Sequence, residues 1–210
     1  MIAIVDYGMG NLRSVVNAFR AIGEEPRLIS DPGTLGEADA IVLPGVGAFA
    51  EGMARLEKCG MRDVLERAVR REGKPFLGLC LGMQLMASES IEHGSHAGLD
   101  WISGSVQRLP ETSDGAPVRV PHVGWNDLEV IRRDGLLRDV STNPTFYYVH
   151  SYYLEAGDPE VVSAYTTHGA RFAAVVEHEN LFGTQFHPEK SQVDGLALLR
   201  SFAVAARRGC

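Results

Sequence analysis

Cys80 is the residue of this chain best placed to act as a nucleophile. It is the middle residue of Gly-Leu-Cys-Leu-Gly at positions 78–82, which continues the apolar run 76–79. A glycine on either side lets the chain turn sharply from a strand into a helix, with the nucleophile exposed in a strained conformation. The positive end of that helix favours the thiolate. A small cysteine buried at a strand end is the alternative, and the two glycines favour the catalytic interpretation.

A base and a carboxylate follow another apolar run. His187, Pro188 and Glu189 come directly after the run 181–186. Residues two apart on an extended segment face the same side, so we expect His187 to reach Cys80 while Glu189 orients the imidazole. By itself His-Pro-Glu is typical of a plain turn. Together with the cysteine it predicts a Cys–His–Glu triad.

A glycine-rich turn could stabilise the negative charge of a tetrahedral intermediate. Pro-Gly-Val-Gly at 44–47 follows the apolar run 40–43. Such a turn can aim the backbone N–H of Val46 or Gly47 at an oxyanion, and the N–H of Leu81, directly after the nucleophile, would be the second donor. A tight turn that merely requires a positive φ is the alternative.

The elements that must position these residues alternate in the first half of the chain. Short apolar runs predict strands, and apolar residues at helical spacing predict helices, the first capped by Asn11 and the last running from about 82 to 88. Fully apolar strands separated by helices are typical of a parallel sheet covered on both faces. The loops 8–10, 44–47 and 79–82 would then meet at the carboxyl ends of the strands, where ligands bind. The strands are expected at 2–5, 27–30, 40–43 and 76–79.

The second half of the chain is richer in β structure. A final helix is expected near 194–207, and no repeat or linker interrupts the 210 residues. We therefore expect a single domain, residues 1–210, with a mixed sheet. The strands are expected at 106–109, 118–120, 128–131, 146–149, 161–165, 173–177 and 181–186.

Composition excludes several classes of protein. With 45% hydrophobic residues the chain is not disordered, and a net charge of −7 argues against a nucleic-acid partner. No apolar run approaches the ~18 residues of a membrane span. The N-terminus lacks a secretory signal, so we expect a cytoplasmic protein in which Cys59 and Cys210 are incidental and form no disulfide.

Neither a cofactor nor a metal is predicted. Gly8-Met9-Gly10 could begin a dinucleotide fingerprint, but Arg13 stands where its third glycine would fall. His93 with His96, or the stretch 177–179, lack a further ligand at a known spacing.

Three motifs together resemble the class I (triad) glutamine amidotransferases: Gly-Leu-Cys-Leu-Gly-Met-Gln at 78–84, Pro-Gly-Val-Gly at 44–47 and Gln-Phe-His-Pro-Glu at 185–189. The resemblance covers nearly the whole chain. It implies an α/β, flavodoxin-like class I glutamine amidotransferase domain with a largely parallel central sheet, helices on both faces and extra β structure in the second half. It also implies that glutamine is hydrolysed through a γ-glutamyl thioester and that ammonia passes to a synthase partner.

Further segments resemble one branch of that family, the glutaminase subunits of imidazole glycerol phosphate synthase. They are Asp-Tyr-Gly-Met-Gly-Asn at 6–11, Pro-His-Val-Gly-Trp-Asn at 121–126, Tyr-Tyr-Val-His-Ser-Tyr at 147–152, and Lys-Ser at 190–191. This branch implies a heterodimer with a cyclase subunit, a (β/α)₈ barrel, in L-histidine biosynthesis. It also implies that the 44–47 turn reorganises before its donor points inward.

The resemblance assigns roles to individual residues. Cys80 would be the nucleophile, His187 the general base and then acid, and Glu189 the residue that orients it. Gln84 also stands on its own, because it lies one helical turn beyond Cys80. Core packing is the alternative for Trp125. The residues implied to hold L-glutamine are Gly47, Gln84, Glu92, His150, Ser151 and Tyr152, and those implied to face the cyclase are Asn11, Trp125, Tyr147 and Lys190.

Three rival functions remain open from the sequence. A stand-alone γ-glutamyl hydrolase or cysteine peptidase would use the same triad without a partner. The glutaminase of another synthase would lack the segment at 121–126. A non-catalytic binding module would not require an intact triad.

Overall fold

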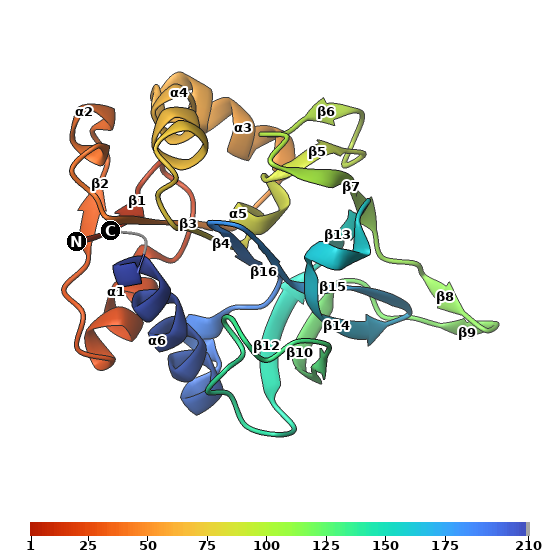
Figure 1. Ribbon diagram of the computed structural model, residues 1–210. Helices are drawn as coiled ribbons and strands as arrows, with labels where there is room; N and C mark the ends of the chain where they lie inside the picture. The colour runs from red at the N-terminus through yellow and green to blue at the C-terminus, as the bar shows by residue number, and fades with distance from the viewer. Residues whose placement is uncertain (209–210) are drawn as a thin grey trace.

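The computed structural model describes residues 1–208, so Cys210 lies outside the described residues. Its centre is an eight-stranded sheet with the strand order β11-β14-β15-β16-β4-β3-β1-β2 (Figure 1). The strands of this sheet are β1 (Ile2–Val5), β2 (Arg27–Ile29), β3 (Ala40–Gly45), β4 (Phe76–Cys80), β11 (Glu129–Val130), β14 (Val162–His168), β15 (Ala170–His178) and β16 (Leu181–Thr184).

The parallel part of the sheet contains the strands that carry the predicted chemistry. β2, β1, β3, β4 and β16 are parallel in that order, whereas β15, β14 and β11 continue the sheet antiparallel. The order of the five parallel strands is that of flavodoxin-like folds, in which ligands bind beyond the carboxyl ends of the strands. The α/β fold is therefore confirmed. The central sheet as a whole is mixed, with a parallel part and an antiparallel part.

Helices cover both faces of the sheet because the strands are apolar on both sides. Ala3 and Val5 pack into one core with α3 (Phe49–Lys58) and α4 (Met61–Leu65), and Ile2 and Ile4 pack into the other with α1 (Leu12–Ala21) and α6 (Gln192–Arg208). Figure 1 shows these two pairs of helices on opposite sides of the sheet. The helices are α1 (Leu12–Ala21), α2 (Pro32–Leu35), α3 (Phe49–Lys58), α4 (Met61–Leu65), the π-helix η1 (Glu66–Arg71), α5 (Leu81–Gln84), the 3₁₀ turns η2 (Pro159–Val161) and η3 (Pro188–Lys190), and α6 (Gln192–Arg208).

Three small sheets make up the extra β structure of the second half. One has the order β13-β7-β5-β6, and the others are the ribbons β10-β12 and β8-β9. Their strands are β5 (Ala87–Ser90), β6 (His96–Ala97), β7 (Ile102–Arg108), β8 (Thr112–Ser113), β9 (Ala116–Pro117), β10 (His122–Asp127), β12 (Thr145–His150) and β13 (Tyr152–Ala156).

Two predicted elements are wrong. The helix expected to continue to residue 88 ends at Gln84, since Ala87–Ser90 forms β5 and pairs with β7 and β6. The strand expected at 118–120 is absent, and the nearest strand is β9. Pro121 follows that segment directly and lacks the N–H that a β ladder needs. Among residues 1–208, no helix is both long and apolar enough to cross a membrane.

Candidate active site

Cys80 occupies a strained turn between β4 and α5. Its φ of 52° and ψ of −106° lie outside the regions that most side chains adopt. A Cβ on Gly78 would lie 2.6 Å from the carbonyl oxygen of Gly82, and one on Gly82 would lie 1.8 Å from the carbonyl oxygen of Leu43. The two glycines are therefore required by close backbone approach, as the sequence predicts. The helix that follows is a single turn, so its dipole contributes less than a full-length helix would.

His187 and Glu189 lie together in the interior beside Cys80. The Nδ1 atom of His187 is 2.8 Å from Oε1 of Glu189, and the two side chains are 4% and 2% exposed. His187 has an extended backbone, but Glu189 lies in the 3₁₀ turn η3, and this turn brings its carboxylate back to the imidazole. The expectation of a fully extended segment is thus wrong, although the pairing that it predicts is present.

The surroundings of His187 favour its protonated form. Burial lowers the pKa of the imidazole, but the nearby Cys80 sulfur and the Glu189 carboxylate outweigh burial and raise it to about 10. The Nε2 atom of His187 is buried and makes no hydrogen bond of normal geometry. Because Nδ1 is occupied by Glu189, Nε2 is the nitrogen available to the sulfur. A charged imidazole beside a thiol is the arrangement that activates a cysteine nucleophile.

The glycine-rich turn lies next to Cys80. β3 and β4 pair in parallel, with Gly45 opposite Cys80. Gly47 has a φ of +113°, and a Cβ there would lie 2.8 Å from the side chain of Met9. Val46, Gly47 and Leu81 all line one cavity with Cys80. The loops after β1, β3 and β4 therefore meet at one edge of the sheet, as predicted.

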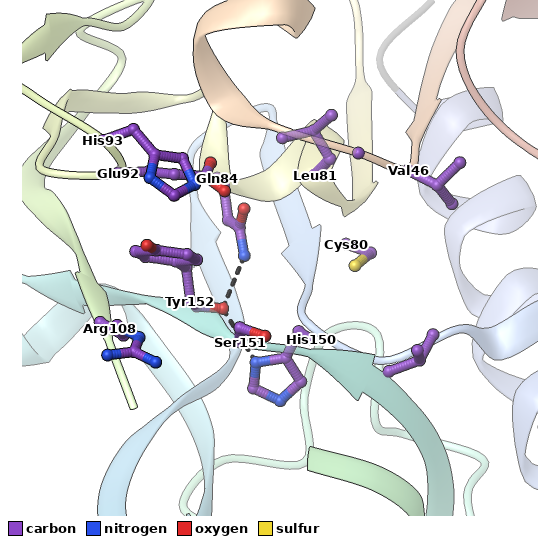
Figure 2. Close-up of a pocket in the computed structure, with 12 residues that line it drawn as sticks. Val46, Cys80, Leu81, Gln84, Glu92, His93, Arg108, His150, Ser151 and Tyr152 are labelled. Atoms are coloured by element: carbon purple, nitrogen blue, oxygen red, sulfur yellow. Dashed lines mark hydrogen bonds between the residues drawn. The ribbon is translucent and has the colours of Figure 1, made fainter. Parts of the chain in front are cut away.

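That cavity has a volume of about 810 Å³ and contains the residues expected to hold glutamine (Figure 2). The Nε2 atom of Gln84 donates to the backbone oxygen of Tyr152 at 2.8 Å, so this amide supports the cavity wall. The residues that line the cavity are Val46, Gly47, Cys80, Leu81, Gln84, Glu92, His93, Arg108, Val149, His150, Ser151 and Tyr152.

Glu92 has a structural partner that the sequence does not reveal. Its Oε2 atom accepts a hydrogen bond from the backbone N–H of Phe49 at 2.6 Å, at the start of α3. The residue before Phe49 is Ala48, which has no side chain that could cap the helix. Glu92 supplies this cap from 43 positions away while also lining the cavity.

Sequence reasoning missed several residues of the site. His93, Arg108 and Val149 line the cavity. Arg108 reaches it because β7 pairs with β13, which places Arg108 opposite Tyr152. Gln185 is fully buried and donates to the Cys80 sulfur at 3.6 Å. Its place two residues before His187 was the available signal.

The four residues expected at a partner interface lie outside the cavity. Trp125 is 48% exposed, which overturns core packing as the alternative. Its ring lies 6.2 Å from that of Tyr147, over which the Nζ atom of Lys190 sits at 5.6 Å. Asn11 caps α1, as predicted, by accepting a hydrogen bond from the Ser14 N–H at 3.4 Å, and α1 contacts η3, which carries Lys190.

Two buried histidines make the stability of the protein sensitive to acid. Burial lowers the pKa of His122 to about 4 and that of His150 to about 3, from 6.5. Below pH 6.5 the unfolded chain therefore binds more protons than the folded one, and stability falls as the pH falls. We expect a loss on the order of 5 kcal/mol from these two groups together between pH 6.5 and pH 4, measured by urea denaturation across that range.

A matched pair of variants separates this effect from the titration of carboxylates. His122→Asn removes a buried titrating group, so its denaturation midpoint should depend less on pH than that of the unmodified protein. His178→Asn, at an exposed position, should leave the pH dependence unchanged. Equal pH dependence in all three proteins would contradict the prediction.

Comparisons with known proteins agree with this geometry. The family model described as Glutamine amidotransferase class-I matches residues 3–206. The imidazole glycerol phosphate synthase subunit HisH of Geobacter sulfurreducens is 47% identical over 203 residues, which cover 96% of this chain and 97% of that protein. The protein of the same name from Methanothermobacter thermautotrophicus is 49% identical over 207 residues, covering 99% and 100%.

Solved structures show the same fold at lower sequence similarity. A structure described as a glutamine amidotransferase has a TM-score of 0.76 and 20% identity, covering 99% of this chain and 100% of that one. A chain in the structure of PurLQS from Thermotoga maritima has a TM-score of 0.73 and 20% identity, covering 97% of each chain. The extent of the family match and the identity to its HisH relatives lead to one conclusion: this chain belongs to the class I glutamine amidotransferase family and, within it, to the HisH subunits.

Proposed function

We propose that this protein is the glutaminase subunit of an imidazole glycerol phosphate synthase. It hydrolyses L-glutamine to glutamate and ammonia. The ammonia passes to a cyclase subunit, a (β/α)₈ barrel, which makes imidazole glycerol phosphate and the carboxamide ribotide by-product in L-histidine biosynthesis. The proposal rests above all on Cys80, which stands on a strained turn beside the buried pair of His187 and Glu189. The shared name of the relatives supports the pathway.

The first half of the reaction forms a thioester. The Cys80 thiolate attacks the side-chain amide carbon of glutamine, and the N–H groups of Leu81 and of Val46 or Gly47 hold the resulting oxyanion. Leu81 is the first residue of α5, so its N–H has no partner within the helix. Protonated His187 then gives a proton to the departing nitrogen, the C–N bond breaks, and ammonia leaves a γ-glutamyl group on the sulfur.

The second half releases glutamate. Neutral His187 takes a proton from a water molecule, whose oxygen attacks the thioester carbon, and the C–S bond breaks to give glutamate and Cys80. Glu189 keeps Nδ1 of the imidazole occupied in both halves, so that Nε2 remains the atom that moves the proton. Gly47, Gln84, Glu92 and the segment 150–152 hold the substrate in the cavity.

The outer face of the β10–β12 ribbon supports a partner surface. Val123, Trp125 and Val149 are exposed on it, and Val149 also lines the cavity. The register pairs Val123 with Val149 and Trp125 with Tyr147. An exposed apolar group of this kind is typical of protein interfaces, where Trp and Tyr are enriched. We place the cyclase on this face, with Asn11 and Lys190 at the same interface, in a cytoplasmic heterodimer.

Glutamate release from glutamine tests the proposal directly. We expect slow release by the chain alone and strong stimulation by a cyclase subunit that carries its ribonucleotide ligand. Trp125→Ala should reduce the stimulation while leaving the slow basal release unchanged. Full activity without a partner would instead indicate a stand-alone hydrolase. No release in either state would contradict the proposal.

A further inference from the structure

The inner face of the β10–β12 ribbon carries a hydrogen-bonded pair of histidines. His122 and His150 lie opposite each other in the ribbon, with His122 Nδ1 3.0 Å from His150 Nε2. Both are buried, and His150 lines the substrate cavity. His122 is outside the cavity, and the reaction steps described above do not use it.

Asn126 fixes, from one end, the direction of the hydrogen bond between His122 and His150. The Oδ1 atom of Asn126 accepts from the backbone N–H of Asp127 at 2.9 Å, and its Nδ2 atom donates to the backbone oxygen of Thr167 at 3.0 Å. These two bonds settle which end of the amide carries the nitrogen. The same Nδ2 lies 3.2 Å from His122 Nε2, which must therefore accept. A neutral His122 then carries its proton on Nδ1 and donates to His150.

The opposite end requires the same direction. His150 Nδ1 lies 2.8 Å from the backbone oxygen of Tyr152, which can only accept (Figure 2). His150 therefore carries its proton on Nδ1, and its Nε2 is the acceptor that His122 needs. Two independent anchors thus select one tautomer for each ring. Burial keeps both rings neutral by lowering their pKa values.

The chain continues from Tyr152 to the nucleophile. The backbone oxygen of Tyr152 also accepts from Gln84 Nε2 at 2.8 Å (Figure 2). The same Gln84 nitrogen donates to Oε1 of Gln185 at 3.2 Å, and Nε2 of Gln185 donates to the Cys80 sulfur at 3.6 Å. A continuous run of hydrogen bonds therefore joins Asn126, on the ribbon, to the reacting sulfur.

Packing holds His122 in the middle of this chain. Its ring stacks on Tyr148 at 4.7 Å and on His168 at 4.1 Å, with interplanar angles of 22° and 13°. His168 is itself fixed by a contact of its Nε2 with the backbone oxygen of Arg119 at 2.7 Å. The two stacked rings thus fix the orientation of the His122 ring, and only its tautomer is left to be set by hydrogen bonds.

From this chain we infer that His122 is a positioning residue for glutamine hydrolysis: Asn126 fixes its tautomer, so that its Nδ1–H donates to His150 and holds that ring where it supports the Ser151–Tyr152 wall of the substrate cavity. This inference rests on the proposed function, because glutamine hydrolysis is the reaction for which the cavity wall is positioned. An unpaired donor or acceptor in such a buried network is costly, so the wall shifts when the chain is broken.

The tautomers can be measured without any activity. Long-range ¹H–¹⁵N correlation spectra of the full chain labelled at histidine show which ring nitrogens carry protons. We expect protonated Nδ1 and bare Nε2 on both His122 and His150. Asn126→Asp replaces the donor by an acceptor, so His122 should gain a proton on Nε2, whereas His150 should keep its proton on Nδ1 because the Tyr152 oxygen still accepts it. A proton on Nε2 of His150 in the unmodified protein would overturn the inference.

Kinetics in the complex with the cyclase then test the role. His122→Leu and Asn126→Asp should each raise the KM for glutamine about tenfold and change kcat much less. His122→Asn, which keeps a donor near the Nδ1 position, should restore most of the loss. Asn143→Asp adds the same charge at an exposed position and should behave like the unmodified protein. An unchanged KM in both folded variants would refute the positioning role.

The two proposals fail in different ways. If the unmodified complex releases no glutamate, the proposed function is wrong, while the spectra still decide the tautomers. If the complex is active and the variants keep their KM, only the role of His122 is wrong. Should His122→Leu fail to fold, Asn126→Asp carries the test, because it is isosteric and half-buried.

Discussion

Cys80→Ala should abolish glutamine-dependent synthesis by the complex while synthesis from added ammonium continues. In the proposed reaction the sulfur forms the covalent bond to the substrate, so glutamate release should fall by a factor on the order of 10⁴–10⁶, as it does when the nucleophile of a comparable triad is removed. The cyclase does not need that bond, because it receives ammonia directly. Glutamate release and ammonium-driven product formation, measured on the same preparation, check both halves.

Two further results would sharpen this expectation. Cys59→Ala, at a half-buried cysteine outside the cavity, should leave both activities unchanged. The unmodified protein mixed with glutamine and quenched should show a γ-glutamyl adduct on Cys80 by mass spectrometry. Loss of ammonium-driven synthesis in Cys80→Ala would contradict the proposed division of labour between the subunits.

Among substitutions that add one methyl group near the site, Gly82→Ala should destabilise the protein most. The new Cβ would lie 1.8 Å from the backbone oxygen of Leu43, an atom of the central sheet that cannot swing aside. β3 and α5 must therefore separate, which removes buried contacts on both and moves Cys80. We expect a loss of more than about 4 kcal/mol of unfolding free energy, measured by urea denaturation, or failure to accumulate folded protein.

Gly36→Ala provides the matched control. Gly36 has a φ of −59° and no atom within 4 Å of a new Cβ, so alanine should be neutral or slightly stabilising there. A Gly82→Ala protein with near-normal stability would show that the turn at Cys80 does not depend on this close approach.

The sequence by itself determined the parallel half of the fold and the three catalytic candidates. Apolar runs such as Ile2–Val5 can be predicted as strands because strands buried on both faces must be apolar throughout. The glycines around Cys80 predict a tight turn because only glycine lets two backbone segments approach so closely. These signals are local, and each is contained in a few consecutive residues.

Tertiary structure decided the rest, because the deciding contacts join residues far apart in the chain. Ala87–Ser90 is a strand since β7 lies beside it, although its local pattern suits a helix. Glu92 caps α3 from 43 positions away, and Arg108 reaches the cavity only through the pairing of β7 with β13.

The pairing of His122 with His150 is of the same kind. Neither residue's neighbours indicate a hydrogen bond, and the register of the β10–β12 ribbon alone brings the rings together. Side-chain type and local spacing thus indicated the atoms that we propose to react. The sheet register, which depends on the packing of the whole core, decided which groups surround them and in which protonation state they are held.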